Sequence, residues 1–203
     1  MRRVLAVALA VVLNSIGHSM TIVTNMGSMP WPASIVNIMH TLQWTMTETI
    51  FTEGLVVIIL NALITGRIIW ANLGKEFAFL IPYSILMQWF AGWWRHFGID
   101  RLPMVWRLAF DLLGLVTAFT GFAIYQRARC CHPHDDLSVT LKKHFNVHFT
   151  MGFNMVLPII IIVICVLHNH ALYAVHVGTV IGLLIQPRIV NFCDEHMPAF
   201  CRC

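Results

Sequence analysis

One acidic residue, Glu53, lies inside an apolar run that is long enough to cross a membrane. The run ends at Arg67, and at 1.5 Å per residue the carboxylate lies roughly 21 Å from that end of a helix. In a hydrocarbon core about 30 Å thick, Glu53 would lie just inside the opposite face. A charge at that depth is costly, so it should face protein or water and have a partner. Glu53 is therefore a candidate for binding a proton or a cation; the alternative is a carboxylate at a wet helix end.

Two short segments that open with proline are candidates for binding an anionic group. The first, 30–40, begins with Pro30-Trp31, and Asn37 and His40 give it a polar side. The second, 133–144, begins with Pro133 and carries Asp135 in its first turn. A helix N-terminus offers free N–H groups and a partial positive charge. Asp135 is the expected N-cap of the second segment. Its carboxylate would take the place of an anion there, so the first segment is the better anion candidate.

The two segments differ in how we expect them to meet the membrane. The first has room to dip into the bilayer and return, as a re-entrant half-helix. In the second, Leu137, Leu141 and Phe145 recur every four residues, and basic residues gather near its end. This pattern predicts a helix that lies flat on the cytoplasmic surface with its basic residues toward anionic lipid. A re-entrant path is the alternative.

Cysteine and histidine residues gather in two places and suggest a soft-metal site as a weaker possibility. Thiolates and imidazoles are the ligands that Zn and Cu prefer. These residues are Cys130, Cys131 and His132 in one cluster, and Cys193, His196, Cys201 and Cys203 in the other. Neither has a paired Cys-x-x-Cys spacing, and on the expected cytoplasmic side the thiols would stay reduced. No other cofactor is expected.

Composition predicts that these residues are positioned by membrane-spanning helices. Of the 203 residues, 58% are hydrophobic and 11% are charged, and the mean hydropathy is +0.74. Soluble domains have about 25% charged residues. A net charge of +4, carried by scattered basic residues, gives no nucleic-acid surface. No catalytic triad order, phosphate loop or zinc-protease motif occurs, so we expect an all-α polytopic membrane protein that is not an enzyme.

The apolar runs predict six spans. No Lys, Arg, Asp or Glu occurs from position 4 to 47 or from 144 to 187. The expected spans are 4–26, 47–67, 77–95, 107–127, 148–167 and 171–191. With the N-terminus inside, ten Lys and Arg residues fall on the inner side and three on the outer side. This bias predicts that both termini are cytoplasmic.

The two halves of the chain repeat each other. Glycine or proline recurs at a spacing of 103 or 104 positions in three pairs, namely Gly17 with Gly121, Pro30 with Pro133, and Gly74 with Gly178. Three spans per repeat would give the two copies opposite orientations in the membrane. We therefore expect a first repeat over 1–100, a second over 101–192, and a tail over 193–203. If the proline-led segments cross fully, there are eight spans and the repeats are parallel.

Short motifs at these positions resemble the YitT/YczE family of bacterial membrane proteins. The motifs are Gly27-Ser28-Met29-Pro30-Trp31, Cys131-His132-Pro133-His134-Asp135-Asp136-Leu137 and Gly178-Thr179-Val180-Ile181-Gly182. Two departures are Lys75-Glu76, where the family has Gly-Thr, and Asn154, near the position that matches Glu53. The resemblance implies a bacterial inner-membrane protein of permease type and names no substrate.

Together these features favour a small-solute permease with its site at the interface between the repeats. The expected substrate or ion residues are Gly27, Pro30, Trp31, Asn37, His40, Glu53, Pro133, Asp135 and Asn154. The alternatives are an accessory subunit that works with a membrane partner, and soft-metal handling. Ala6 and Ala10 form a small-residue face on which such a partner or a second copy could dock.

Overall fold

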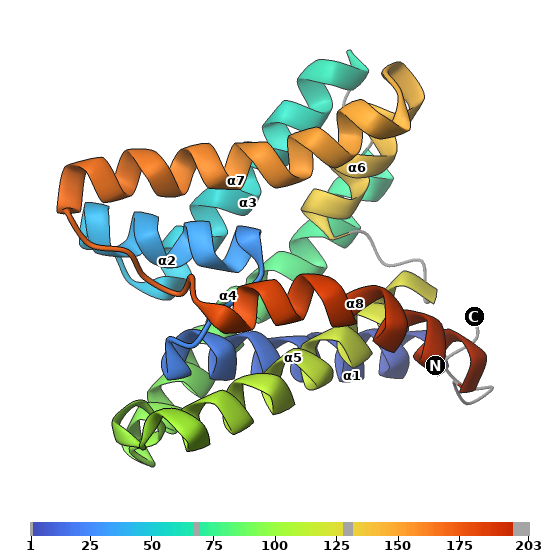
Figure 1. The fold of residues 1–203 in the computed structure, drawn as a ribbon. Coiled ribbons are helices and arrows are strands. Elements are labelled where there is room, and N and C mark those ends of the chain that lie inside the picture. Colours follow the sequence, from blue (N-terminus) through green and yellow to red (C-terminus); the bar gives the residue numbers. More distant parts are fainter. Residues whose placement is uncertain (1, 67–69, 128–131, 197–203) are drawn as a thin grey trace.

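The computed structural model describes residues 2–66, 70–127 and 132–196, and these residues form helices joined by short connections (Figure 1). Eight α-helices and one short 3₁₀ helix follow in chain order over these ranges, without a strand. They are α1 (Arg2–Thr24), α2 (Pro30–Leu42), α3 (Met46–Thr65), α4 (Trp70–His96), η1 (Ile99–Arg101), α5 (Met104–Arg127), α6 (Pro133–His144), α7 (Val147–Asn169) and α8 (Val177–His196). The predicted all-α class is confirmed.

Four of the helices are long and apolar enough to cross a membrane. They are α1, α3, α5 and α7, with apolar stretches of 20 to 24 residues. Helix α4 spans 27 residues but is less apolar, and the apolar part of α8 covers only 177–193. The sixth predicted span begins too early, because residues 171–176 are not helical. Spans within α4 and α8 stay predictions.

Local chemistry sets several helix ends. Proline occupies the first position of α2 and of α6, where a missing N–H costs nothing. Helix α3 begins with a capping box between Thr45 and Glu48 and ends at Gly66, whose φ of 69° suits glycine. The N-cap of α6 is His132, whose ring accepts a hydrogen bond from the His134 N–H, so the prediction of Asp135 as N-cap is wrong. Asp135 lies in the first turn instead.

Helices α1 and α5 lie side by side and run in opposite directions (Figure 1). Glycine makes this close approach possible. A Cβ atom added to Gly17 would lie 2.3 Å from the backbone nitrogen of Ala118, and one added to Gly121 would lie 2.7 Å from the backbone nitrogen of Asn14. Where the helices cross, the Asn14 side chain donates a hydrogen bond to the Ala118 carbonyl at 3.1 Å.

The short helices pack across the two halves of the chain. Helix α2 packs against α7, and α6 packs against α3. Within each half, by contrast, α1 packs against α4, and α5 packs against α8. Leu137 and Leu141 of α6 are fully buried in a cluster with Val57 of α3. The apolar side of α6 therefore faces protein, where the sequence pattern suggested lipid, and the position of α6 at the membrane surface stays a prediction.

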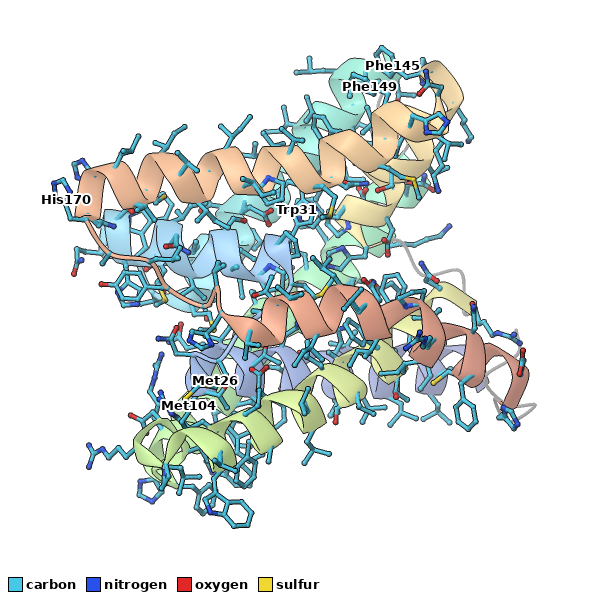
Figure 2. All side chains as sticks on the ribbon, viewed as in Figure 1. Met26, Trp31, Met104, Phe145, Phe149 and His170 are labelled. Atoms are coloured by element: carbon cyan, nitrogen blue, oxygen red, sulfur yellow. The ribbon has the colours of Figure 1, made fainter. Side chains whose placement is uncertain are left out.

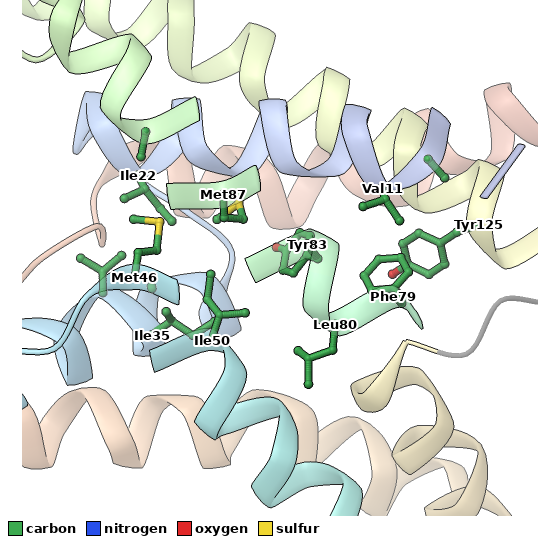
Figure 3. Close-up of a cluster of buried hydrophobic side chains, with 14 of the residues drawn as sticks. Val11, Ile22, Ile35, Met46, Ile50, Phe79, Leu80, Tyr83, Met87 and Tyr125 are labelled. Carbon is green, nitrogen blue, oxygen red and sulfur yellow. The ribbon is translucent and has the colours of Figure 1, made fainter. Parts of the chain in front are cut away.

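The main apolar core lies between α1, α2, α3, α4 and the end of α5 (Figure 3). Its side chains on α4 include Phe79, Leu80, Tyr83 and Met87, and those on α2 and α3 include Ile35, Met46 and Ile50. By contrast, large apolar side chains on α7 are exposed, among them Met151, Ile164 and Leu167. An exposed apolar face of this kind is expected where a helix contacts lipid.

Candidate functional site

A cavity of about 290 Å³ lies where the first turns of α2 and α6 meet. Pro30 and Trp31 enter it from α2, and Pro133, His134 and Asp135 enter it from α6. Helices α1, α3, α4, α5, α7 and α8 supply the remaining walls. Because both short helices point their N-termini at one space, two partial positive charges from the helix ends converge there.

Trp31 and His134 form the closest ring contact between the two short helices. Their ring centroids are 4.2 Å apart, with the planes tilted by 43°. Trp31 lies near the middle of the helix bundle (Figure 2). Each residue directly follows the proline that opens its helix, so the contact joins equivalent positions of the two segments.

Glu53 of α3 is paired with His134. The Glu53 Oε1 atom lies 2.9 Å from the His134 Nε2 atom, and only 11% and 13% of the two side chains are exposed. This is the partner that a carboxylate at this depth needs. Sequence reasoning missed His134, although the register of Pro30-Trp31 against Pro133-His134 could have identified it.

Besides Glu53 Oε1, which faces His134 Nε2, four buried polar atoms of residues that line the cavity have no protein partner in the described part of the chain. They are His18 Nδ1, Trp31 Nε1, His134 Nδ1 and Asp135 Oδ2. A buried polar group without a partner costs about 1–3 kcal/mol. A solute that supplies both hydrogen-bond acceptors and donors would remove that cost, so the cavity is suited to a polar ligand.

Burial also shifts the ionisation of two groups at the start of α6. Burial raises the pKa of the Asp135 carboxyl, although a hydrogen bond from the Tyr125 hydroxyl opposes this shift. Burial lowers the pKa of the His132 imidazole well below its usual range, and the imidazoles of His134 and His18 lower it further. The His132 ring packs among aromatic rings, with the Phe79 ring centroid 4.8 Å away. The folded chain therefore favours a neutral His132.

Six of the nine predicted site residues line the cavity. These are Pro30, Trp31, Glu53, Pro133, Asp135 and Asn154. Asn154 is half-buried and donates a hydrogen bond to the Ser138 hydroxyl at 2.9 Å, so it joins α7 to α6. The position that we matched to Glu53 thus carries an amide in the same cavity.

Asn37, His40 and Gly27 lie outside the cavity: the first two contact the connection between α7 and α8, and Gly27 lies against the start of α8. The Asn37 side chain donates to the Tyr173 carbonyl at 2.8 Å and accepts from the Tyr173 N–H at 3.2 Å. The His40 ring stacks on the Tyr173 ring with centroids 3.9 Å apart. Gly27 has a φ of 140°, and a Cβ there would lie 2.2 Å from the backbone nitrogen of Thr179. The structure thus gives these residues structural contacts away from the cavity.

An ion pair that the spacing of Arg107 and Asp111 suggests does not form. Both side chains are hydrogen-bonded to Thr24 instead. The Thr24 hydroxyl donates to Asp111 Oδ1 at 2.8 Å, and the Thr24 carbonyl accepts from Arg107 Nη1 at 3.3 Å. The i to i+4 spacing brought the two residues to one face of α5, but packing against α1 supplied nearer partners.

No group of three or more metal-binding side chains comes together among the residues that the structure describes. Cys130, Cys131, Cys201 and Cys203 lie outside these residues. Cys193 contacts the Thr120 hydroxyl at 3.8 Å, and the His196 ring stacks on Phe192. His132 caps α6. The soft-metal hypothesis has no support in the described part of the chain.

Long apolar helices around a cavity with polar and aromatic walls define an integral membrane protein. The chain belongs to DUF6198, a family of unknown function, whose match covers residues 1–195. No curated protein and no solved structure matches the chain.

Proposed function

We propose that the protein is a permease that binds a small polar solute in the cavity between α2 and α6. The observation that carries the proposal is the meeting of two proline-led helix N-termini, one from each half of the chain, at a cavity with unpartnered buried polar atoms. Broken or half-length helices that point their ends at a central site are typical of secondary transporters.

The packing of α1 on α5 supports the inverted repeat that such a permease requires. Gly17 approaches Gly114 and Ala118, whereas Gly121 approaches Ala10 and Asn14. Positions 10, 14 and 17 become 114, 118 and 121 when 104 is added to each. Each contact that Gly17 makes with α5 therefore has an equivalent contact between Gly121 and α1. In the same way, the packing of α2 in the first half on α7 in the second half corresponds to the packing of α6 in the second half on α3 in the first half. Both observations support a pseudo-two-fold axis between the halves.

The same symmetry would place the cavity at the interface between the repeats. The first helix begins and α8 ends at the same end of the molecule (Figure 1). This arrangement agrees with the prediction, made from the charge bias, that both termini are cytoplasmic.

The walls indicate the chemistry of the solute. Trp31 Nε1 can only donate a hydrogen bond, so the solute must carry an acceptor. Asp135 and the Glu53–His134 pair can respond to a donor or a positive charge. Rings of Tyr83 and Phe119 supply apolar contact. A small solute with both polar and apolar parts fits these walls.

Binding is tested first, by thermal unfolding of the detergent-purified chain against amino acids, vitamins, organic anions and soft metals. A ligand at 100 times its dissociation constant stabilises the folded state by about 2.7 kcal/mol, which shifts the melting temperature visibly. The ligand that produces a shift is then used, radiolabelled, for uptake into proteoliposomes. No shift with any class and no uptake, in folded protein, would contradict the proposal.

Glu53→Gln tests whether the cavity carries the activity. This substitution removes the charge that faces His134, so we expect uptake to fall at least tenfold, while the protein stays folded. The matched control is Asp100→Asn, because Asp100 is an exposed carboxylate that does not line the cavity. Normal uptake by the Glu53→Gln variant would remove Glu53 from the mechanism.

The small-residue face that the sequence suggested for docking of a partner subunit is not accessible in the folded chain. Ala6 and Ala10 are completely buried within the chain itself, and Ala10 lies against Gly121 of α5. Docking of a partner on this face would require α1 and α5 to separate.

A further inference from the structure

A second polar cluster lies at the other end of α3, away from the central cavity. Asp136 of α6 accepts hydrogen bonds from the side-chain amides of Asn61, at 2.6 Å, and Asn72, at 3.4 Å. The Glu76 carboxyl group of α4 lies beside that of Asp136 in the same pocket. The cluster lines a pocket of about 450 Å³, so it is reachable from outside the helix packing.

Two carboxyl groups can share a hydrogen bond only when one of them carries a proton, because a carboxylate can only accept. Glu76 is 3% exposed, and like charges held this close in a buried place repel strongly. One proton shared between the two acidic side chains removes this repulsion.

Two side-chain oxygen atoms of the cluster accept no hydrogen bond. Glu76 Oε1 and Asn61 Oδ1 have no hydrogen-bond partner, although only 3% and 8% of the two residues are exposed. Both residues line the pocket, and their free oxygens are acceptors. Acceptors without donors favour the presence of a bound proton or of a water that delivers one.

Asp136 is adjacent in sequence to the residues that form the central cavity. His134 and Asp135 precede it directly in the first turn of α6 and line the cavity between α2 and α6. A 12-residue helix moves largely as one body, so a force on Asp136 is passed to His134 and Asp135. Leu137 and Leu141 anchor the same helix to Val57.

We propose that the Glu76–Asp136 pair is a site for one exchangeable proton, and that loss of this proton loosens α6 and shifts the cavity residues that α6 carries. With the proton present, Asp136 ties α6 to α3 and α4. Without it, two carboxylates face each other and the tie becomes a repulsion. As the coupling-proton site of a permease, the pair rests on the proposed function; as a proton-dependent latch, it can be tested without any solute.

Other charged groups face this pair and enter the interpretation. Lys143 and His144 of α6 line the same pocket, and Asp135 lies one residue before Asp136. From α3 the pocket receives only the neutral side chains of Asn61, Ala62, Thr65 and Ile58. Lys143 partly offsets the charge that appears when the proton leaves, so the latch loosens rather than opens fully.

The test is hydrogen–deuterium exchange of the α6 backbone in the detergent-purified full chain, measured over a pH series for wild type and Glu76→Gln. The Gln side chain can donate to Asp136 at every pH, so it keeps the latch closed. Comparison at the same pH cancels the intrinsic pH dependence of amide exchange. We expect equal exchange at acid pH and about threefold or faster exchange in wild type at alkaline pH.

Asp136→Asn is the second variant, because its amide can donate to the Glu76 carboxylate and should also remove the pH dependence. Asp100→Asn, at an exposed carboxylate, should keep the wild-type behaviour. Infrared spectroscopy should show a protonated-carboxyl band that disappears with rising pH in wild type and is missing from Glu76→Gln. A wild-type to Glu76→Gln exchange ratio of one at every pH, or a band unchanged by both variants, overturns the inference.

The two proposals fail separately. Uptake by proteoliposomes with no pH-dependent change in α6 would leave the permease and remove the latch. A pH-dependent α6 in a chain that binds and transports nothing would leave the latch and remove the permease.

Discussion

The Trp31 indole and the His134 imidazole face each other with ring centroids 4.2 Å apart, and each follows the proline that begins a short helix. The contact joins two segments from opposite halves of the chain. Both rings line the cavity, and their atoms Trp31 Nε1 and His134 Nδ1 both lack a protein partner there. The two helix starts therefore depend on each other for packing while they leave polar atoms free for a ligand.

Trp31→Phe removes the indole N–H but keeps an aromatic ring beside His134. Because Trp31 Nε1 makes no hydrogen bond within the protein, we expect the melting temperature to change little. The affinity for the solute should fall roughly two- to tenfold, the loss expected for one hydrogen bond. Ligand-dependent thermal unfolding measures both quantities. The control is Trp70→Phe, at a residue that is 74% exposed; equal affinities of both variants and wild type would show that the indole N–H does not bind the solute.

Gly17→Ala should destabilise the crossing of α1 and α5. The added Cβ would lie 2.3 Å from the Ala118 backbone nitrogen and 2.4 Å from the Gly114 carbonyl oxygen, and neither backbone atom can move without moving α5. We expect the free energy of unfolding to fall by about 1–3 kcal/mol. Unfolding of the purified chain in detergent provides the measurement.

Gly92→Ala is the matched control for the helix crossing. Gly92 also lies in a helix, but a Cβ there would meet no atom within 4 Å. Alanine is the better helix former, so this variant should be unchanged or more stable by up to about 1 kcal/mol. Equal losses at both glycines would show that close packing of α1 on α5 is not what Gly17 provides.

Asn37→Ala should release the connection between α7 and α8. Asn37 is 1% exposed and satisfies both the N–H and the carbonyl of Tyr173. Each buried backbone group left without a partner costs about 1–3 kcal/mol. We expect faster hydrogen exchange over residues 171–176 and a lower melting temperature. Asn169→Ala removes only a side-chain hydrogen bond, to Thr41, and should have the smaller effect; the reverse order would contradict this role.

The pH dependence of stability should reveal the buried His132. Its pKa in the folded chain is lowered from 6.5, so the folded state binds this proton less readily than the unfolded state. The contribution of His132 to the free energy of unfolding is constant above the pKa of the unfolded state. Below that pKa, the free energy of unfolding falls by about 1.4 kcal/mol for each unit of decrease in pH. His132→Asn keeps an N-cap acceptor and should flatten this decline. His196→Asn, at an exposed histidine, should leave the decline as steep as in wild type.

The sequence by itself determined the helical class and the places where helices begin. Apolar runs such as 147–169 predict a helix because only a helix satisfies its own backbone in lipid, and Pro30 and Pro133 open helices because proline fits a first turn. It also singled out Glu53, since a lone carboxylate in such a run must have a partner. These features depend on a residue and its near neighbours in the chain.

Only the tertiary structure decided which polar groups meet. Helical periodicity relates a residue to neighbours up to four positions away. The pairing of Glu53 with His134, and of Glu76 with Asp136, instead depends on how closely and at what angle the helices pack. That packing also turned Leu137 toward α3 rather than toward lipid. The same packing leads the connection after α7 past α2, so the Asn37 side chain is hydrogen-bonded to the Tyr173 backbone.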